Sequence, residues 1–312
     1  MMSYEEFKNK LQEQIVKYLE EGCTLKVNTV HKPNRDMEAL AVIKPSNTTV
    51  GINLCFEDLY DEYFGGEAFD DVVQNAAEVV NREDVTNVIC LENIFANVKQ
   101  LVFPCLVNTD KNREYLETVP HREFLDLSII YKKVVEGTEG VATLTNSMLE
   151  NIGMTEEELY EAAIRNMVGL NGIFLGDVVL MLHGFLFNDD AEDGCIYLSR
   201  EELVKLTLPE NDCFSGSIPL YRVSNRYNVY GSSAFLVPEL WKGVSDFLNE
   251  SVYIWPNSVH ELLFMKESTC EDTSHLIDMI HEANYSLVAP EDFLSNNLYF
   301  YNKDTGEISI VA

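Results

Sequence analysis

Basic side chains are scarce in this chain. It has 22 lysines and arginines against 52 aspartates and glutamates, a net charge of −30 over 312 residues. Proteins that bind nucleic acid do so largely through clustered Lys and Arg, which neutralise phosphates. Attachment to anionic lipid relies on the same side chains. The composition therefore predicts a protein that binds neither nucleic acid directly nor a membrane surface.

Long hydrophobic runs are missing as well. The most apolar stretch, residues 173–187, is interrupted by Asp177 and His183. It is also shorter than the roughly 18 apolar residues that a membrane-spanning helix needs. The N-terminus has no basic segment leading into an apolar one, which a signal peptide would show. We therefore predict a cytoplasmic location.

Cysteine occurs without a pattern that implies a disulfide or metal framework. The seven cysteines are an odd number, lie far apart and mostly have apolar neighbours. Secreted disulfide-rich domains and zinc sites show short, regular cysteine spacings instead. The thiols are therefore expected to be reduced and mostly buried.

The sequence contains the first residues of two metal-binding motifs, and neither motif is complete. His260-Glu261 begins like a zinc-protease motif, but Phe264 stands where the second histidine ligand is needed. The acidic loop 189–194 begins like a calcium loop, but Arg200 stands where that loop needs a bidentate glutamate. The sequence therefore predicts no metal-ligating residues.

Other catalytic and cofactor signatures are incomplete or absent. Residues 304–306 spell the Asp-Thr-Gly triplet of aspartic proteases, but they follow Lys303 at a hairpin, where Asp and Gly are ordinary turn residues. The sequence contains no GxSxG nucleophile elbow, no GxGxxG loop and no GxxxxGK[ST] loop. We therefore predict no catalytic residues and no cofactor.

What the chain does contain is enough apolar sequence to fold, with 46% hydrophobic residues. Ser3 with Glu6, and Thr155 with Glu158, have the spacing of capping boxes, which mark helix starts. Apolar residues then recur at helical spacing. Helices are expected over residues 3–22 and 57–95, from Asn146, from Thr155, and over residues 172–186, 234–248 and 272–283.

Alternating apolar and polar residues between these segments predict strands. Pro104 should place its strand at a sheet edge or in a bulge, because proline lacks the backbone donor. Hairpin meanders with separate helices are typical of an α+β fold with antiparallel strands. Strands are expected over residues 24–31, 40–43, 50–54, 101–107, 124–135, 141–144, 220–224, 251–255 and 260–265, followed by a closing hairpin of 298–301 and 308–311.

No Pro/Gly/Ser-rich linker divides the chain. We therefore expect a single full-length α+β unit, residues 1–312, in one or two closely packed lobes. The best soft boundary is near residues 118–120. It would separate an N-terminal lobe, residues 1–118, from a C-terminal lobe, residues 119–312.

Five polar residues at predicted strand ends are the best candidates for a binding site. His121 and His260 each follow a proline closely and begin an apolar strand. Asn225 lies in a segment that mixes arginines with tyrosines, and Ser258 and Glu261 flank His260. For the histidines, a hydrogen-bonded structural role is the favoured alternative to a role in proton transfer.

Several segments together resemble a bacterial family known only as domain-of-unknown-function family 5688. The resemblance covers nearly the whole chain and implies a full-length unit, but it implies no activity and no site residues. The segments are Tyr4-Glu5-Glu6-Phe7, Val119-Pro120-His121, Asp126-Leu127-Ser128, Thr145-Asn146-Ser147-Met148-Leu149, Thr155-Glu156-Glu157-Glu158-Leu159, Ser224-Asn225, Gly231-Ser232-Ser233-Ala234, Trp255-Pro256-Asn257-Ser258-Val259-His260-Glu261, Val288-Ala289-Pro290-Glu291-Asp292 and Leu294-Ser295.

Three functional hypotheses remain open. The first is an acidic protein of the bacterial cytoplasm that binds a protein partner or a small ligand without catalysis. The second is a decoy that presents carboxylates where a nucleic-acid-binding protein expects phosphates. The third is an unrecognised enzyme that uses the His, Glu and Asn residues among the five candidates.

Overall fold

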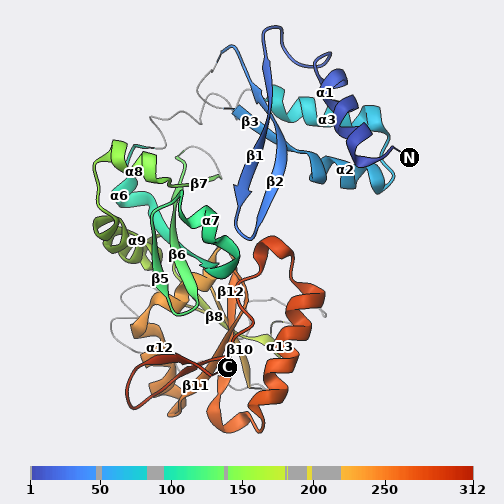
Figure 1. The fold of residues 1–312 in the computed structure, drawn as a ribbon. Helices are drawn as coiled ribbons and strands as arrows, with labels where there is room; N and C mark the ends of the chain where they lie inside the picture. Colours follow the sequence, from blue (N-terminus) through green and yellow to red (C-terminus); the bar gives the residue numbers. More distant parts are fainter. Residues whose placement is uncertain are drawn as a thin grey trace. The chain divides into compact units, whose positions relative to one another are not determined.

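The computed structural model describes residues 2–46, 51–82, 95–136, 140–179, 181, 195–198 and 219–311. The chain forms two compact units, Met1–Ala96 with Val134–Ala142, and Asn97–Lys133 with Thr143–Ala312. Each unit combines helices with antiparallel strands (Figure 1). The fold class is therefore α+β, as the sequence predicts. Residues 118–120 lie inside the second unit.

The described residues of the first unit form a three-stranded antiparallel meander, in the order β1-β2-β3, with three helices. Its first helix begins at the predicted capping box of Ser3 and Glu6 and buries Phe7, Leu11 and Ile15 completely. These side chains form one apolar core with the other two helices and the sheet. The elements are α1 (Tyr4–Ile15), β1 (Thr24–Lys32), β2 (Arg35–Ile43), β3 (Gly51–Cys55), α2 (Phe56–Phe64) and α3 (Phe69–Asn81).

The region predicted to be helical over residues 57–95 begins with two helices, α2 and α3, and α3 ends at Asn81. Gly66 lies between the two helices with a φ of 112°, a conformation that only glycine adopts without strain. Residues 83–94 of the predicted helix lie outside the described residues.

The second unit contains a smaller sheet with the strand order β4-β6-β5 and β7 added to β6. Pro104 lies in β4, which pairs with β6 alone among the described strands, so this proline is at a sheet edge as predicted. The strand predicted over residues 124–135 is present as β6, and it is preceded by β5 in a hairpin that turns at Leu125 with a φ of 57°. The strands are β4 (Val102–Asn108), β5 (His121–Phe124), β6 (Leu127–Val134) and β7 (Val141–Thr143).

The larger sheet of the second unit has seven strands in the order β14-β13-β11-β12-β10-β8-β9. Trp241 of α12 packs on one face of this sheet, and Leu276 and Ile280 of α13 pack on the other (Figure 1). The predicted closing hairpin is confirmed as β13 and β14. The strands are β8 (Ile173–Asp177), β9 (Cys195–Leu198), β10 (Leu220–Ser224), β11 (Val252–Ser258), β12 (Glu261–Lys266), β13 (Tyr299–Tyr301) and β14 (Ile308–Ile310).

Helices of the second unit begin largely where the sequence places them. Thr155 and Glu158 form the predicted capping box. The cap of the preceding helix is Thr145 rather than the predicted Asn146, because the Thr145 hydroxyl accepts from the backbone of Met148. The helices are α6 (Val98–Leu101), α7 (Arg113–Leu116), α8 (Asn146–Ile152), α9 (Glu156–Asn171), α12 (Pro238–Leu248) and α13 (Thr273–Leu287), with a 3-10 helix η3 (Gly231–Leu236).

The buried helix predicted over residues 172–186 is wrong at its start. Residues 173–177 form β8, which is buried throughout and pairs with β10 and β9. Gly172, with a φ of 60°, turns the chain from α9 into this strand. A short apolar run has the same composition in a buried helix and a buried strand, so periodicity alone does not separate them. Residues 182–186 lie outside the described residues.

None of the described helices is long and apolar enough to cross a membrane. Cys23, Cys55, Cys105 and Cys270 are free thiols. Cys105 is fully buried, and burial raises the pKa of its thiol to about 12.

Asp126 joins the β5–β6 turn to the C-terminal segment. Its carboxylate accepts hydrogen bonds from Ser295 at 2.8 Å, Asn297 at 2.9 Å and Tyr299 at 2.5 Å. Burial, followed by the charge of Asp126, raises the pKa of the Tyr299 hydroxyl. The folded chain therefore holds this tyrosine in its neutral form.

This arrangement predicts a loss of stability in alkali. A tyrosine in the unfolded chain loses its proton near pH 10, whereas Tyr299 in the folded chain keeps it. The free energy of unfolding should therefore fall as pH rises above about 10, by up to about 1.4 kcal/mol per pH unit for one such group. Urea unfolding at a series of pH values measures this slope. Tyr299→Phe should reduce it, and Tyr285→Phe, which alters a 94% exposed ring, should not. Equal slopes in all three proteins would contradict the assignment.

Candidate functional site

Asn225 organises the loop that follows β10. Its side chain is buried, and its Oδ1 accepts from the backbone N–H groups of Tyr227 at 3.0 Å and Val229 at 3.3 Å. Its Nδ2 donates to the carbonyl of Val229 at 2.6 Å. Asparagine commonly stabilises turns in this way. The residue predicted as a binding candidate therefore holds its own loop in place.

The loop ends in a tight crossing at Tyr230 and Gly231. Tyr230 has a left-handed backbone, with a φ of 56°. A Cβ on Gly231 would lie 2.6 Å from the carbonyl oxygen of His260 and 2.7 Å from the backbone nitrogen of Asn225. Real Cβ atoms essentially never come this close to other atoms. Glycine is therefore required here because of space.

His260 uses both ring nitrogens within the protein. Its Nδ1 accepts from the backbone N–H of Tyr230 at 3.1 Å. Its Nε2 lies 3.1 Å from the carboxylate of Asp292. An Nδ1 that accepts carries no proton, so a neutral ring donates from Nε2 to Asp292. This hydrogen bonding supports a structural role for His260.

Ser258 and Glu261 are also bonded to nearby groups. The Ser258 hydroxyl accepts from the backbone N–H of His260 at 3.0 Å, which shapes the β11–β12 turn. Glu261 forms an ion pair with Arg222 of the neighbouring strand β10 and accepts from Asn257. The structure thus brings four of the five predicted residues together where β10, η3 and the β11–β12 turn meet.

His121 lies apart from this group. It begins β5, its side chain is exposed, and its Nδ1 lies 3.1 Å from the carbonyl oxygen of Val119. Within the described part of the chain, it shares none of the contacts that join the other four candidates.

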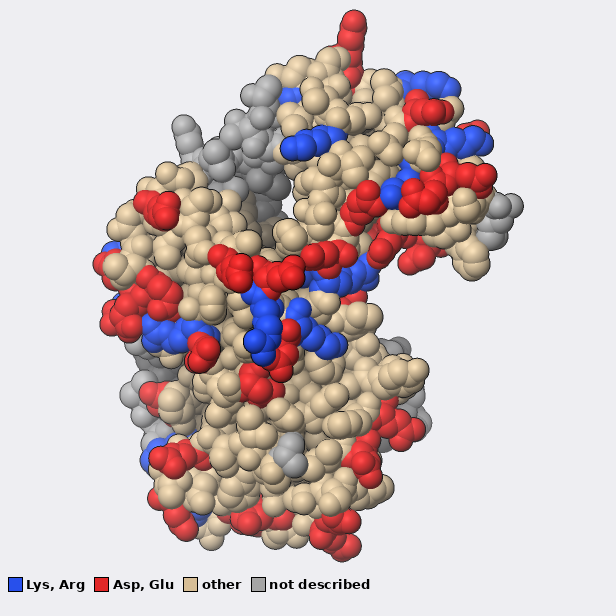
Figure 2. Space-filling model, in the orientation of Figure 1, with Lys and Arg blue, Asp and Glu red and all other residues tan. Residues whose placement is uncertain are grey.

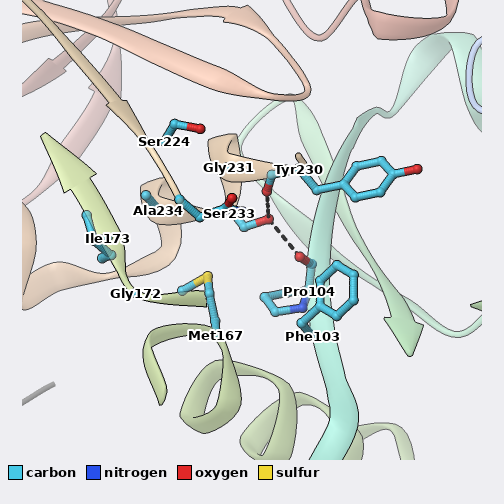
Figure 3. Close-up of a pocket in the computed structure, with 11 residues that line it drawn as sticks. Phe103, Pro104, Met167, Gly172, Ile173, Ser224, Tyr230, Gly231, Ser233 and Ala234 are labelled. Carbon is cyan, nitrogen blue, oxygen red and sulfur yellow. Dashed lines mark hydrogen bonds between the residues drawn. The ribbon is translucent and has the colours of Figure 1, made fainter. Parts of the chain in front are cut away.

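The cavity beside the Tyr230–Gly231 crossing is small. It is lined by Phe103, Met167, Asn225 and Ser233, among others (Figure 3), and has a volume of about 10 Å³. That is about the space that one water molecule needs, and it is far below the volume of ordinary ligand pockets. The phenol ring of Tyr230 points away from the cavity (Figure 3). In this structure the cavity does not admit a metabolite.

Three further residues of the site were missed by the sequence analysis. Asp292 bonds to His260 from a position 32 residues later. The ring of Tyr230, just before η3, contacts Lys132 of β6, which lies 98 residues earlier in the chain. No local spacing indicates such pairs. The signal that was available for Tyr230 is the glycine that follows it, since glycine often marks a close approach of two backbones.

Charged side chains around the described surface are often paired. Arg122 forms ion pairs with Glu156 and Glu157 of α9, and Arg35 forms one with Glu57. Figure 2 shows carboxylates over much of the visible face, with Lys or Arg beside several of them. Among the residues that the structure describes, no three His, Cys, Asp or Glu side chains are placed to hold a metal ion.

These observations define an α+β protein in which the clustered polar side chains form their hydrogen bonds with other groups of the protein. The family whose model matches residues 4–303 is described as "Family of unknown function (DUF5688)", and the chain belongs to this family. No curated protein and no solved structure matches the chain.

The close packing of Gly231 yields a stability prediction. Gly231→Ala should lower the free energy of unfolding by about 3 kcal/mol, at the upper end of ordinary overpacking costs, because two of the crowded atoms belong to backbone. The matched control is Gly169→Ala in α9, where a Cβ meets nothing within 4 Å. That change should raise stability by about 0.5–1 kcal/mol. Denaturant unfolding measures both, and equal effects would refute the packing argument.

The hydrogen bonds of His260 predict its tautomer. Near neutral pH, ¹⁵N NMR of the ring should show an unprotonated Nδ1 and a protonated Nε2, since Tyr230 donates to the first and Asp292 accepts from the second. Replacing Asp292 with Asn keeps a hydrogen-bond partner for Nε2 and serves as the control for ring orientation. A proton on Nδ1 in the neutral ring would be inconsistent with this geometry.

Proposed function

We propose that the chain is a binding protein of the bacterial cytoplasm, which takes up a small ligand or a partner protein without converting it. The observation that carries this proposal is that the polar side chains of the candidate site are hydrogen-bonded to groups of the protein itself. A general base needs a nitrogen or oxygen that faces the substrate. His260, the best candidate for that role, directs one nitrogen to Tyr230 and the other to Asp292.

The neighbouring side chains support the same interpretation. Glu261 is engaged by Arg222, and the carboxamide of Asn225 makes three bonds to its own loop. Residues held in this way are suited to keeping a surface rigid, which lowers the entropy that binding costs. The free thiols fit a reducing compartment, and the family resemblance points to bacteria.

The decoy hypothesis receives less support. A mimic of nucleic acid needs carboxylates in a continuous row at phosphate-like spacing. Several carboxylates belong to ion pairs, and Lys or Arg side chains lie beside many of those visible in Figure 2. Carboxylates interspersed with basic side chains are typical of a solubilising surface charge.

The test is to follow binding and turnover together. The full-length protein is dialysed against a bacterial small-molecule extract, and immobilised protein is exposed to lysate at low and high salt. We expect at least one compound or protein to be enriched, with each enriched compound unchanged in mass over hours. His260→Gln, which retains one acceptor and one donor, should bind as the wild type does.

Two results would oppose the proposal. The first is a compound that disappears while a product forms, at a rate that His260→Gln abolishes. This result would establish an enzyme. The second is enrichment of nothing at any salt concentration.

A further inference from the structure

Lys132 is a buried lysine whose positive charge meets no carboxylate of the described residues. It is 7% exposed, on strand β6. Its Nζ donates to the hydroxyl of Thr143 at 2.9 Å and lies 4.9 Å from the centre of the Tyr230 ring. The chain has 52 acidic residues, so the lack of a partner does not reflect a lack of carboxylates. Burying an unpaired ammonium is costly.

The strand places Lys132 on a defined face of the smaller sheet. Tyr131 points toward α9, because its hydroxyl donates to Glu156. Successive side chains of a strand alternate, so Lys132 lies on the opposite face. Phe103 stands across from it in β4. His121 stands opposite Ile130 in β5, on this same face and one strand away from Lys132.

The groups that surround the ammonium are neutral. Burial raises the pKa of the Cys105 thiol to about 12, although Lys132 acts to lower it. Burial likewise raises the pKa of Tyr230 to about 12 and also raises that of Tyr115. The carboxylate that acts on the Tyr230 hydroxyl is Asp292, which is bonded to His260. No neighbour among the described residues supplies the missing negative charge.

We propose that Lys132 binds an oxyanion, the phosphate or carboxylate group of a ligand, on this face of the sheet. The ammonium has three N–H donors, and Thr143 takes one of them. The other two can donate to oxygens of the anion. Tyr115 and Tyr230 are half-buried beside Lys132, and their neutral hydroxyls are further donors. The inference rests on the proposed function, since it names the chemical class of ligand that the protein would take up.

The position of Tyr230 gives the site its rigidity. Its left-handed backbone is held by His260 on one side, and its carbonyl accepts from Ser233 at 3.0 Å on the other. Ser233 also bonds to the carbonyl of Pro104 in β4. The ring that covers Lys132 is therefore fixed to the same sheet that carries Lys132, so an anion meets donors that need little reorganisation.

The experiment uses the full-length protein and inorganic phosphate as the probe. Thermal unfolding and titration calorimetry are measured with phosphate, sulfate or acetate, against chloride at the same ionic strength. We expect at least one of the three oxyanions to raise the midpoint of unfolding in a saturable way, whereas chloride should not. Adenosine monophosphate is the second probe. Tighter binding of this nucleotide than of phosphate would place the phosphate in a larger ligand, and equal binding would favour a free anion.

The variant that tests the residue is Lys132→Met. It removes the charge, keeps most of the volume and leaves no buried cation behind. The protein without anion should therefore be at least as stable as the wild type, which shows that it folds. Its affinity for the oxyanion should fall by about tenfold or more. Lys303→Met, which alters a half-buried lysine bonded to Asn249, should bind as the wild type does.

The proposal is overturned if none of the three oxyanions stabilises the wild type beyond chloride, or if Lys132→Met responds as strongly as the wild type. Either result leaves the enrichment experiment of the proposed function untouched. Conversely, turnover that depends on His260 would refute the non-catalytic function and leave the oxyanion measurement valid. The two failures are thus distinguishable.

Discussion

The close approach of two backbones at Gly231 is the constraint on which the cluster in the second unit depends. Because this residue lies against the carbonyl of His260 and the nitrogen of Asn225, the preceding Tyr230 turns into the left-handed region. That turn aims its N–H at the His260 ring. It also lets the Tyr230 carbonyl meet the hydroxyl of Ser233. The absence of a side chain at Gly231 is thus linked to two hydrogen bonds of Tyr230, one with His260 and one with Ser233.

The same crossing joins the two sheets of the second unit. Gly231 begins η3, and Ser233 in that short helix donates to Pro104, the edge-strand residue of the smaller sheet. Proline lacks a backbone donor, but its carbonyl remains an acceptor. The carbonyl of Pro104 at the edge of the smaller sheet therefore accepts a hydrogen bond from η3, which follows β10 of the larger sheet. This contact brings the Tyr230 ring over Lys132, which neither sheet would achieve alone.

Local features of this fold were predictable, and features that depend on distant partners were not. The capping box at Thr155 and the edge position of Pro104 follow from chemistry within a few residues. The apolar pattern of residues 173–177 predicts a helix as readily as a strand, because only the pairing with β10 and β9 distinguishes a buried strand from a buried helix. The bond between His260 and Asp292 joins a turn to a segment 32 residues later. Sequence reasoning singled out the histidine, but its partner is set by the fold.

A chain with a net charge of −30 is at first sight a poor host for an anion. This conflict is resolved because the interaction between two charges weakens with the distance between them and with screening by salt. Surface charges are screened within about 8 Å at physiological ionic strength, whereas an interaction with a recessed group is screened much less. Distant carboxylates therefore reduce the affinity of Lys132 for a small anion only modestly. A large polyanion would meet many carboxylates at once and be repelled. The acidic surface and the buried Lys132 together favour one small oxyanion over nucleic acid, which makes the net charge a source of selectivity.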